Sequence, residues 1–207
     1  AVGDAMTADP IEAPLRSTPM ATPPITYVRH AMPMVEGDAP STEWHLDEPV
    51  RAAAQEWAGR LEVGRGIGVL VSSTEPKALE TARAIAARWD SSVTEDPRLR
   101  EAQRPWIGTG YRAVAHRYLR GERPEGWEEH VAVAERMADA VADALAAAGD
   151  RTAIVVSHGL ALSIHLGDRL GPDFDRETFW SRLAFPDAWA LDADDVLHRS
   201  LPPAPIS

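Results

Sequence analysis

The chain has 207 residues, of which 44% are hydrophobic and 26% charged, as expected for one globular domain. The net charge of -11 argues against a nucleic-acid partner, because phosphate backbones are bound by surplus lysine and arginine. The lack of cysteine excludes disulfides, thiolate metal sites and cysteine nucleophiles. No apolar run approaches the ~20 residues of a membrane span, so we expect no membrane partner and a cytoplasmic location.

The two ends of the chain are expected to lie outside the folded domain. Residues 1–24 are rich in Ala, Pro and Thr and lack the apolar core of a secretory signal, which predicts a flexible arm. Residues 201–207, "LPPAPIS", are expected to form a flexible tail. The domain is therefore expected to span residues 25–200, with no repeat or linker that would divide it.

The predicted elements alternate between strands and helices. In chain order they are a strand at 25–28, a strand at 67–71, a helix at 75–89, a weak strand at 92–94, a helix at 128–148, a strand at 153–156, a helix at 159–170 and a strand at 188–191. Residues 34–50 and 102–126 are expected to form long binding loops. The alternation predicts an α/β fold, a single three-layer domain with a mixed, mostly parallel sheet and helices on both faces.

Two helix boundaries carry specific signals. Ser73 or Thr74 is expected to cap the helix at 75–89, with Pro76 in its first turn. The alanine-rich helix at 128–148 is expected to end at Gly149.

Charged residues and histidines follow each predicted parallel strand. Arg29 and His30 follow the first, Lys77 the second, Glu101 the weak third, and His158 the strand at 153–156. Ligands in open α/β sheets bind at the carboxyl ends of the strands, so we expect these side chains to meet at one edge.

This set of side chains suits a phosphoryl group. Arg29 can bind two phosphate oxygens and Lys77 can supply a further charge, while the helix after Ser157 offers backbone N–H groups. An unprotonated imidazole can attack phosphorus and become a phosphohistidine. A carboxylic acid can protonate the departing alkoxide and then deprotonate the attacking water. No metal is required if enough cations surround the phosphate.

The motifs "VRHA", "SSTEPKALETA", "LREAQRPW" and "VVSHG" resemble the histidine phosphatase superfamily, in its phosphoglycerate mutase-like branch. They occur in family order across residues 25–195. The resemblance implies that His30 is phosphorylated, that Arg29, Lys77 and His158 hold the phosphate, and that Glu101 is the proton donor. It implies neither a metal nor another cofactor.

The chain departs from the family pattern at three places. Ala31 stands where the family usually has glycine, and Lys77 stands where it usually has arginine, which keeps the charge but loses the forked donor. The run from Met32 to Val35 replaces the small polar residues and the asparagine of the mutases, which argues against mutase activity.

Simpler interpretations remain open for each residue. Arg29 and His30 could be a polar strand end, and His158 could merely cap its helix. Lys77 could be a helix-surface lysine, with another cation in its place. The alternatives named by the sequence are Arg104 or Arg83 for Lys77, and Glu95 or Asp96 for Glu101.

The chain is rich in tryptophan, with seven against three Phe and three Tyr. Trp44, Trp106 and Trp127 lie in the predicted loops, where they either wall a leaving-group pocket or pack the loops. The remaining aromatic expectations are Trp57, Trp89 and Trp180 in the core, His165 in the core or at its rim, and His45, His116, His130 and His198 at the surface.

The sequence therefore predicts a metal-independent hydrolase of a phosphate monoester, acting through a phosphohistidine on a small phosphorylated metabolite. Two alternatives are a phosphomutase of the same family and a phosphate-binding module without turnover. The partner is expected to be the small substrate alone, with the protein a monomer or a homodimer.

Overall fold

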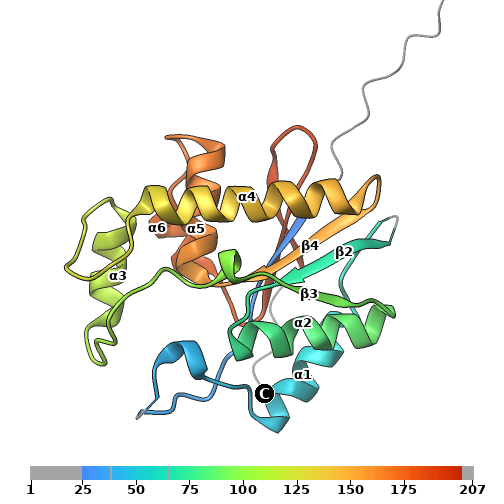
Figure 1. Ribbon diagram of the computed structural model, residues 1–207, viewed down its shortest axis with the longest axis horizontal. Coiled ribbons are helices and arrows are strands. Elements are labelled where there is room, and N and C mark those ends of the chain that lie inside the picture. The colour runs from blue at the N-terminus through green and yellow to red at the C-terminus, as the bar shows by residue number, and fades with distance from the viewer. Residues whose placement is uncertain (1–24, 38, 65, 202–207) are drawn as a thin grey trace, which may run out of the picture.

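The computed structural model describes residues 25–37, 39–64 and 66–201. The predicted arm 1–24 and residues 202–207 of the predicted tail lie outside this part. The described residues form one α/β domain around a six-stranded sheet (Figure 1). In spatial order its strands are β3 (Val93–Glu95), β2 (Ile67–Ser72), β4 (Thr152–Ser157), β1 (Ile25–Arg29), β5 (Asp187–Leu191) and β6 (Leu197–Leu201).

The sheet is mixed. Strands β3, β2, β4 and β1 run parallel, whereas β5 pairs antiparallel with β1 and β6 pairs antiparallel with β5. The predicted fold class, with a mostly parallel sheet between two helical layers, is confirmed. In the part of the chain that the structure describes, no helix has the length and apolar character needed to cross a bilayer.

Helices cover both faces of the sheet. In chain order they are η1 (Ser41–Glu43), α1 (Glu48–Ala58), α2 (Pro76–Trp89), η2 (Pro97–Leu99), α3 (Tyr111–Leu119), α4 (His130–Ala148), α5 (Gly159–Leu170) and α6 (Arg176–Arg182). Helices α1 and α2 lie on one side of the sheet, and α4 lies across the other with α5 and α6 beside it (Figure 1).

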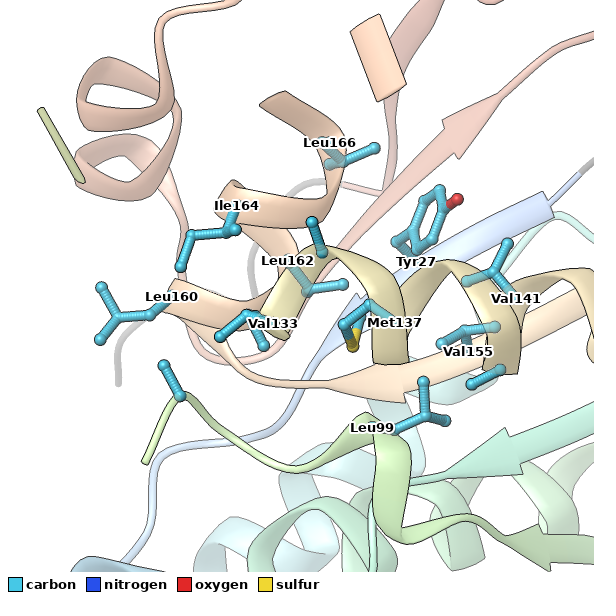
Figure 2. Close-up of a cluster of buried hydrophobic side chains, with 14 of the residues drawn as sticks. Tyr27, Leu99, Val133, Met137, Val141, Val155, Leu160, Leu162, Ile164 and Leu166 are labelled. Atoms are coloured by element: carbon cyan, nitrogen blue, oxygen red, sulfur yellow. The ribbon is translucent and has the colours of Figure 1, made fainter. Parts of the chain in front are cut away.

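The central strand β4 explains why the core divides in two. Every residue of β4 is buried, and successive side chains of a strand point to opposite faces. Ala153 and Val155 belong to the cluster under α4 and α5, whereas Ile154 and Val156 belong to the cluster under α1 and α2. Figure 2 shows the first cluster, to which α4 contributes Met137, α5 contributes Leu162 and β4 contributes Val155. A strand buried on both faces is expected to be continuously apolar, as this one is between Thr152 and Ser157.

Several elements were not predicted. Helix α3 interrupts the expected loop at 102–126, and α1 begins at Glu48, inside the expected loop at 34–50. Gly110 precedes α3 with a φ of 95° and provides no side-chain cap, so α3 lacks a start signal. By contrast, Asp47 caps α1 by accepting the Val50 N–H, a signal that the sequence does contain.

The other differences lie at chain edges and caps. Helix α6 and strand β6 were also not predicted; β6 is a partly exposed edge strand with charged residues, and it ends at the buried Leu201, which was assigned to the tail. The N-cap of α2 is Glu75, without a side-chain cap, rather than Ser73 or Thr74. Helix α4 is followed by Gly149, as predicted.

Candidate active site

One cavity of about 300 Å³ lies at the carboxyl ends of β1 and β2. It brings together Arg29, His30, Lys77 and Glu101, four of the five charged and histidine side chains predicted for this edge. The remaining residues around it are Met32, Pro33, Val35, Ser41, Trp44, Glu75, Arg104, Trp106, Tyr111 and Phe185.

Hydrogen bonds fix the end of β1. Arg29 pairs with Ser157 in the parallel register of β1 and β4, and the backbone N–H of His30 donates to the Ser157 carbonyl at 3.2 Å. The next residue, Ala31, donates its N–H to the hydroxyl of Thr81 in α2 at 2.9 Å. The chain is thus held on two sides immediately around His30.

The imidazole of His30 has the geometry of a nucleophile. Its Nδ1 lies 2.7 Å from the Ala31 carbonyl, which can only accept, so Nδ1 carries the proton and Nε2 keeps its lone pair. Burial lowers the pKa of His30 well below 6.5, and the neighbouring His158, Lys77 and Arg29 lower it further. At neutral pH the ring is therefore uncharged and able to attack.

Arg29 is held against an aromatic ring. Its guanidinium carbon lies 3.5 Å from the centroid of Phe185, and Nη1 donates to the Leu183 carbonyl at 2.9 Å. Burial lowers the pKa of Arg29 to about 10, while Glu101 partly opposes this, so the group remains charged at neutral pH. Within the described part of the chain its buried Nε has no hydrogen-bond partner, which leaves a donor for an anion.

Lys77 is buried, not a helix-surface lysine. Its Nζ donates to the Glu75 carboxylate and to the Ser41 carbonyl, both at 2.5 Å. Glu75 is almost as buried, and its other oxygen accepts the backbone N–H of Glu101 at 2.8 Å and lies 3.6 Å from Nε2 of His158. Glu75 therefore connects three of the predicted site residues.

Reasoning from the sequence missed Glu75. The sequence shows only that Glu75 lies two residues before Lys77 inside the second motif. The need for a partner follows from the burial of Lys77, which the structure shows. Burying the Lys77–Glu75 ion pair costs free energy, because both charged groups are removed from water.

Glu101 occupies the N-terminus of α5. Its Oε1 accepts the N–H groups of Ala102 and Ala161, both at 2.9 Å, and its Oε2 accepts that of Leu160 at 3.3 Å. The expectation that these α5 N–H groups would bind phosphate is therefore wrong for Leu160 and Ala161, since a carboxylate already satisfies them. The same bonds hold the Glu101 carboxyl group at the cavity wall.

The alternative acids lie elsewhere. Glu95 is exposed on β3, and Asp96 accepts three hydrogen bonds from the guanidinium of Arg98. Neither lines the cavity, so among the described carboxylates only Glu75 and Glu101 do.

His158 lies behind His30 instead of on the cavity wall. The two ring centroids are 5.0 Å apart, His158 is fully buried, and its Nε2 lies 2.8 Å from the Ser73 hydroxyl. Burial, and then the charges of Lys77 and Arg136, lower the pKa of His158 well below 6.5. Its Nδ1 has no hydrogen-bond partner among the described residues.

Arg104 joins Lys77 in the cavity and does not replace it. Its guanidinium carbon lies 4.5 Å from the centroid of Tyr111, and Nη1 lies 3.4 Å from the Ser41 hydroxyl. Arg83 instead lines a different hollow, between α1 and α2.

The three loop tryptophans separate into two groups. Trp44 and Trp106 line the cavity with their rings edge to face, 5.0 Å between centroids. Trp127 does not line it: the segment before α4 buries this side chain in the core, where it packs against Tyr111 and Tyr118. As expected, Trp57 and Trp180 are buried, Trp89 packs against the core, and His165 is buried, 3.1 Å from the Tyr27 hydroxyl.

Comparison with known proteins identifies the family. Residues 25–185 match the family model of the histidine phosphatase superfamily, branch 1. The chain belongs to this family. The resemblance predicted from the four motifs is thereby confirmed, and so is the predicted class of enzyme, a phosphatase. No curated protein matches the chain.

Solved structures share the family fold. A mycobacterial glucosyl-3-phosphoglycerate phosphatase in complex with inorganic phosphate is 23% identical with a TM-score of 0.67, and the match covers 89% of this chain and 100% of the other. A putative alpha-ribazole-5'-P phosphatase from Escherichia coli is 19% identical with a TM-score of 0.62, covering 90% and 100%. At these identities the likeness concerns the fold alone.

Proposed function

We propose that the protein hydrolyses small phosphate monoesters through a phosphohistidine at His30. The observation that carries the proposal is the neutral imidazole of His30, with Nε2 unprotonated, in a cavity that also holds Arg29, Lys77 and Glu101. The Ala31 carbonyl matters because it keeps the proton on Nδ1, and only an uncharged imidazole with a free nitrogen can become phosphorylated.

The reaction proceeds in two displacements. In the first, Nε2 of His30 attacks phosphorus, the bond from phosphorus to the ester oxygen breaks, and Glu101 gives a proton to the departing alkoxide. In the second, the Glu101 carboxylate takes a proton from water, the water oxygen attacks phosphorus, and the P–N bond breaks. The products are the alcohol, inorganic phosphate and the original enzyme.

The cations stabilise the phosphoryl oxygens during both steps. Arg29, Lys77 and Arg104 line the cavity, and preorganised charges of this kind stabilise a transition state more than they would in water. Among the described residues, no group of three or more His, Asp or Glu is arranged to hold a metal ion. In the proposed mechanism the side-chain cations carry the electrostatic role.

The size of the cavity supports a small substrate. The names of two structural neighbours, a glucosyl-3-phosphoglycerate phosphatase and a putative alpha-ribazole-5'-P phosphatase, also point to small phosphate esters. A mutase is the weaker candidate, because Met32, Pro33 and Val35 line the cavity and offer no polar group to a second acidic substituent. A binding module without turnover would need no proton donor beside the nucleophile, whereas Glu101 is held there by three hydrogen bonds.

Trapping the intermediate tests the proposal. Enzyme mixed with a labelled phosphate monoester and quenched within one turnover should carry a phosphoramidate, which is labile in acid and stable in base. His30→Asn should neither trap label nor release phosphate, whereas His198→Asn, at an exposed histidine outside the cavity, should do both. An acid-stable ester on serine or threonine, or full activity in His30→Asn, would contradict the mechanism.

A further inference from the structure

Large exposed apolar side chains concentrate at this cavity. Among the described residues six such side chains are strongly exposed, and three of them, Met32, Val35 and Trp106, line the cavity. Val35 is 62% exposed and Met32 is 52% exposed. Single exposed apolar residues are ordinary, but a group of them around one cavity marks a binding surface.

Apolar and aromatic residues make up half of the cavity lining. Seven of its fourteen lining residues are apolar or aromatic, and we call five of them, Met32, Pro33, Val35, Trp44 and Trp106, the apolar wall. The charged residues and His30 make up most of the remainder. Beyond Arg29, Lys77 and Arg104, no further lysine or arginine of the described chain lines the cavity, so a second acidic group of a substrate would compete with the phosphate for these three cations.

The apolar wall is held in place by hydrogen bonds. The indole N–H of Trp44 donates to the carbonyls of Glu36 at 3.1 Å and Ala39 at 3.0 Å. The backbone N–H of Met34 donates to the His45 carbonyl at 2.9 Å. Hydrogen bonds within the loop therefore hold Trp44 in place, and the ring of Trp44 packs edge to face against that of Trp106.

We infer that the site accepts monoesters whose alcohol part is apolar and carries no second charge, such as an alkyl or aryl group. The inference rests on the proposed function, since the cations must hold the phosphate for the organic group to reach the wall. A volume of about 300 Å³ is at the small end of ligand pockets, which suits one phosphate with a compact apolar group.

A homologous series of alkyl phosphates isolates this effect. Ethyl, butyl and hexyl phosphate release primary alcohols of nearly equal acidity, so the chemical step is constant along the series. Full burial of one methylene group corresponds to about a fourfold change in an equilibrium constant. Because the wall is partly exposed, kcat/KM is expected to rise about two- to threefold per added methylene, and glycerol phosphate should react more slowly than butyl phosphate.

Matched variants assign the effect to the wall. Val35→Ser and Trp106→Ala should flatten the series, because they should lower kcat/KM for hexyl phosphate more than for ethyl phosphate. Val196→Ser is the control, because Val196 is 55% exposed and lies before β6, away from the cavity, and it should leave the series unchanged.

The two ideas fail in different ways. If every ester is hydrolysed at one rate regardless of chain length, the inference is wrong and the proposed function stands. If no ester is hydrolysed, the proposed function is wrong, and calorimetric binding of ethyl- and hexylphosphonate still tests the inference. Equal affinities for the two phosphonates would overturn it, whereas tighter binding of hexylphosphonate that is lost in Trp106→Ala would support it.

Discussion

The cavity joins two regions that the chain builds differently. We call Arg29, His30, Glu75, Lys77 and Glu101 the polar cluster. Arg29 is the last residue of β1, and the others follow β1, β2 and η2. Hydrogen bonds connect them to each other or to the backbone. The apolar wall comes from the loops that follow β1 and η2, and much of its surface is exposed.

The difference indicates which of the two regions tolerates substitution. Replacing one member of the polar cluster leaves a buried charge or a buried N–H without its partner, which lowers the stability of the domain by several kcal/mol. Replacing an exposed member of the apolar wall changes stability by about 0.5 kcal/mol or less. The polar cluster therefore fits a fixed chemical step and the apolar wall fits a substrate preference.

Glu101→Gln should produce the largest loss within the polar cluster after loss of His30. Glutamine keeps one oxygen that can accept an α5 N–H group, that of Ala161, but it cannot transfer a proton. Turnover of an alkyl phosphate should fall by the ~10²–10⁴-fold that general acid catalysis contributes. Rapid-mixing assays with p-nitrophenyl phosphate provide the comparison, because its phenolate leaves without protonation and should be affected far less. Equal losses on the two substrates would mean that Glu101 acts only as a cap of α5.

Lys77 is expected to matter somewhat less, through its charge. Lys77→Met keeps the packing of the aliphatic part of the side chain but removes the ammonium. The transition-state stabilisation calculated from kcat/KM should fall by ~2–4 kcal/mol, as for other preorganised charge donors. Lys77→Arg should retain more activity than Lys77→Met, because the guanidinium restores the charge.

Glu75→Gln tests the pairing with Lys77. The amide can still accept the Glu101 N–H, but it no longer neutralises the ammonium, so inorganic phosphate should bind more tightly in a calorimetric titration. Weaker phosphate binding in Glu75→Gln would show that the carboxylate positions Lys77 instead of competing for it. Activity in Lys77→Met equal to that of the wild type would remove Lys77 from the site.

Much of the polar cluster could be predicted because parallel strands end at one edge of a sheet. The apolar run at 153–156 predicted a strand, and the residues after it, like those after β1 and β2, were expected at that edge. The burial of His158 next to His30, away from the cavity lining, could not be predicted. The side chain of a residue at a strand end can point either into the cavity or into the protein interior.

The apolar wall depends on contacts between distant residues. Trp106 and Trp127 both lie in a stretch without strong periodicity, and only the packing of Tyr111 and Tyr118 of α3 decides that one lines the cavity while the other is in the core. Helix α3 itself was missed, so its effect on the tryptophans could not be foreseen. Glu75 was missed because its role appears only when Lys77, Glu101 and His158 are brought together.

The smallest predicted effect concerns the stability of the domain in acid. It compares a histidine that is buried outside the cavity, His165, with His30 of the polar cluster. His165 is buried outside the cavity, and burial, followed by the charge of Arg169, lowers its pKa to about 4. Between pH 6.5 and about 4 the unfolded chain binds a proton at this position that the folded chain does not, so the free energy of unfolding falls as the pH falls. For a shift of this size the loss is at most about 3 kcal/mol, and it is complete below pH 4.

Urea unfolding at a series of pH values should show a flatter decline in the free energy of unfolding for His165→Gln than for the wild type. Glutamine retains an acceptor for the Tyr27 hydroxyl. His30→Gln should also flatten the decline, because burial and the neighbouring His158, Lys77 and Arg29 lower the pKa of His30 as well. Identical curves for wild type and His165→Gln would mean that His165 takes up its proton in the folded state as readily as in the unfolded chain.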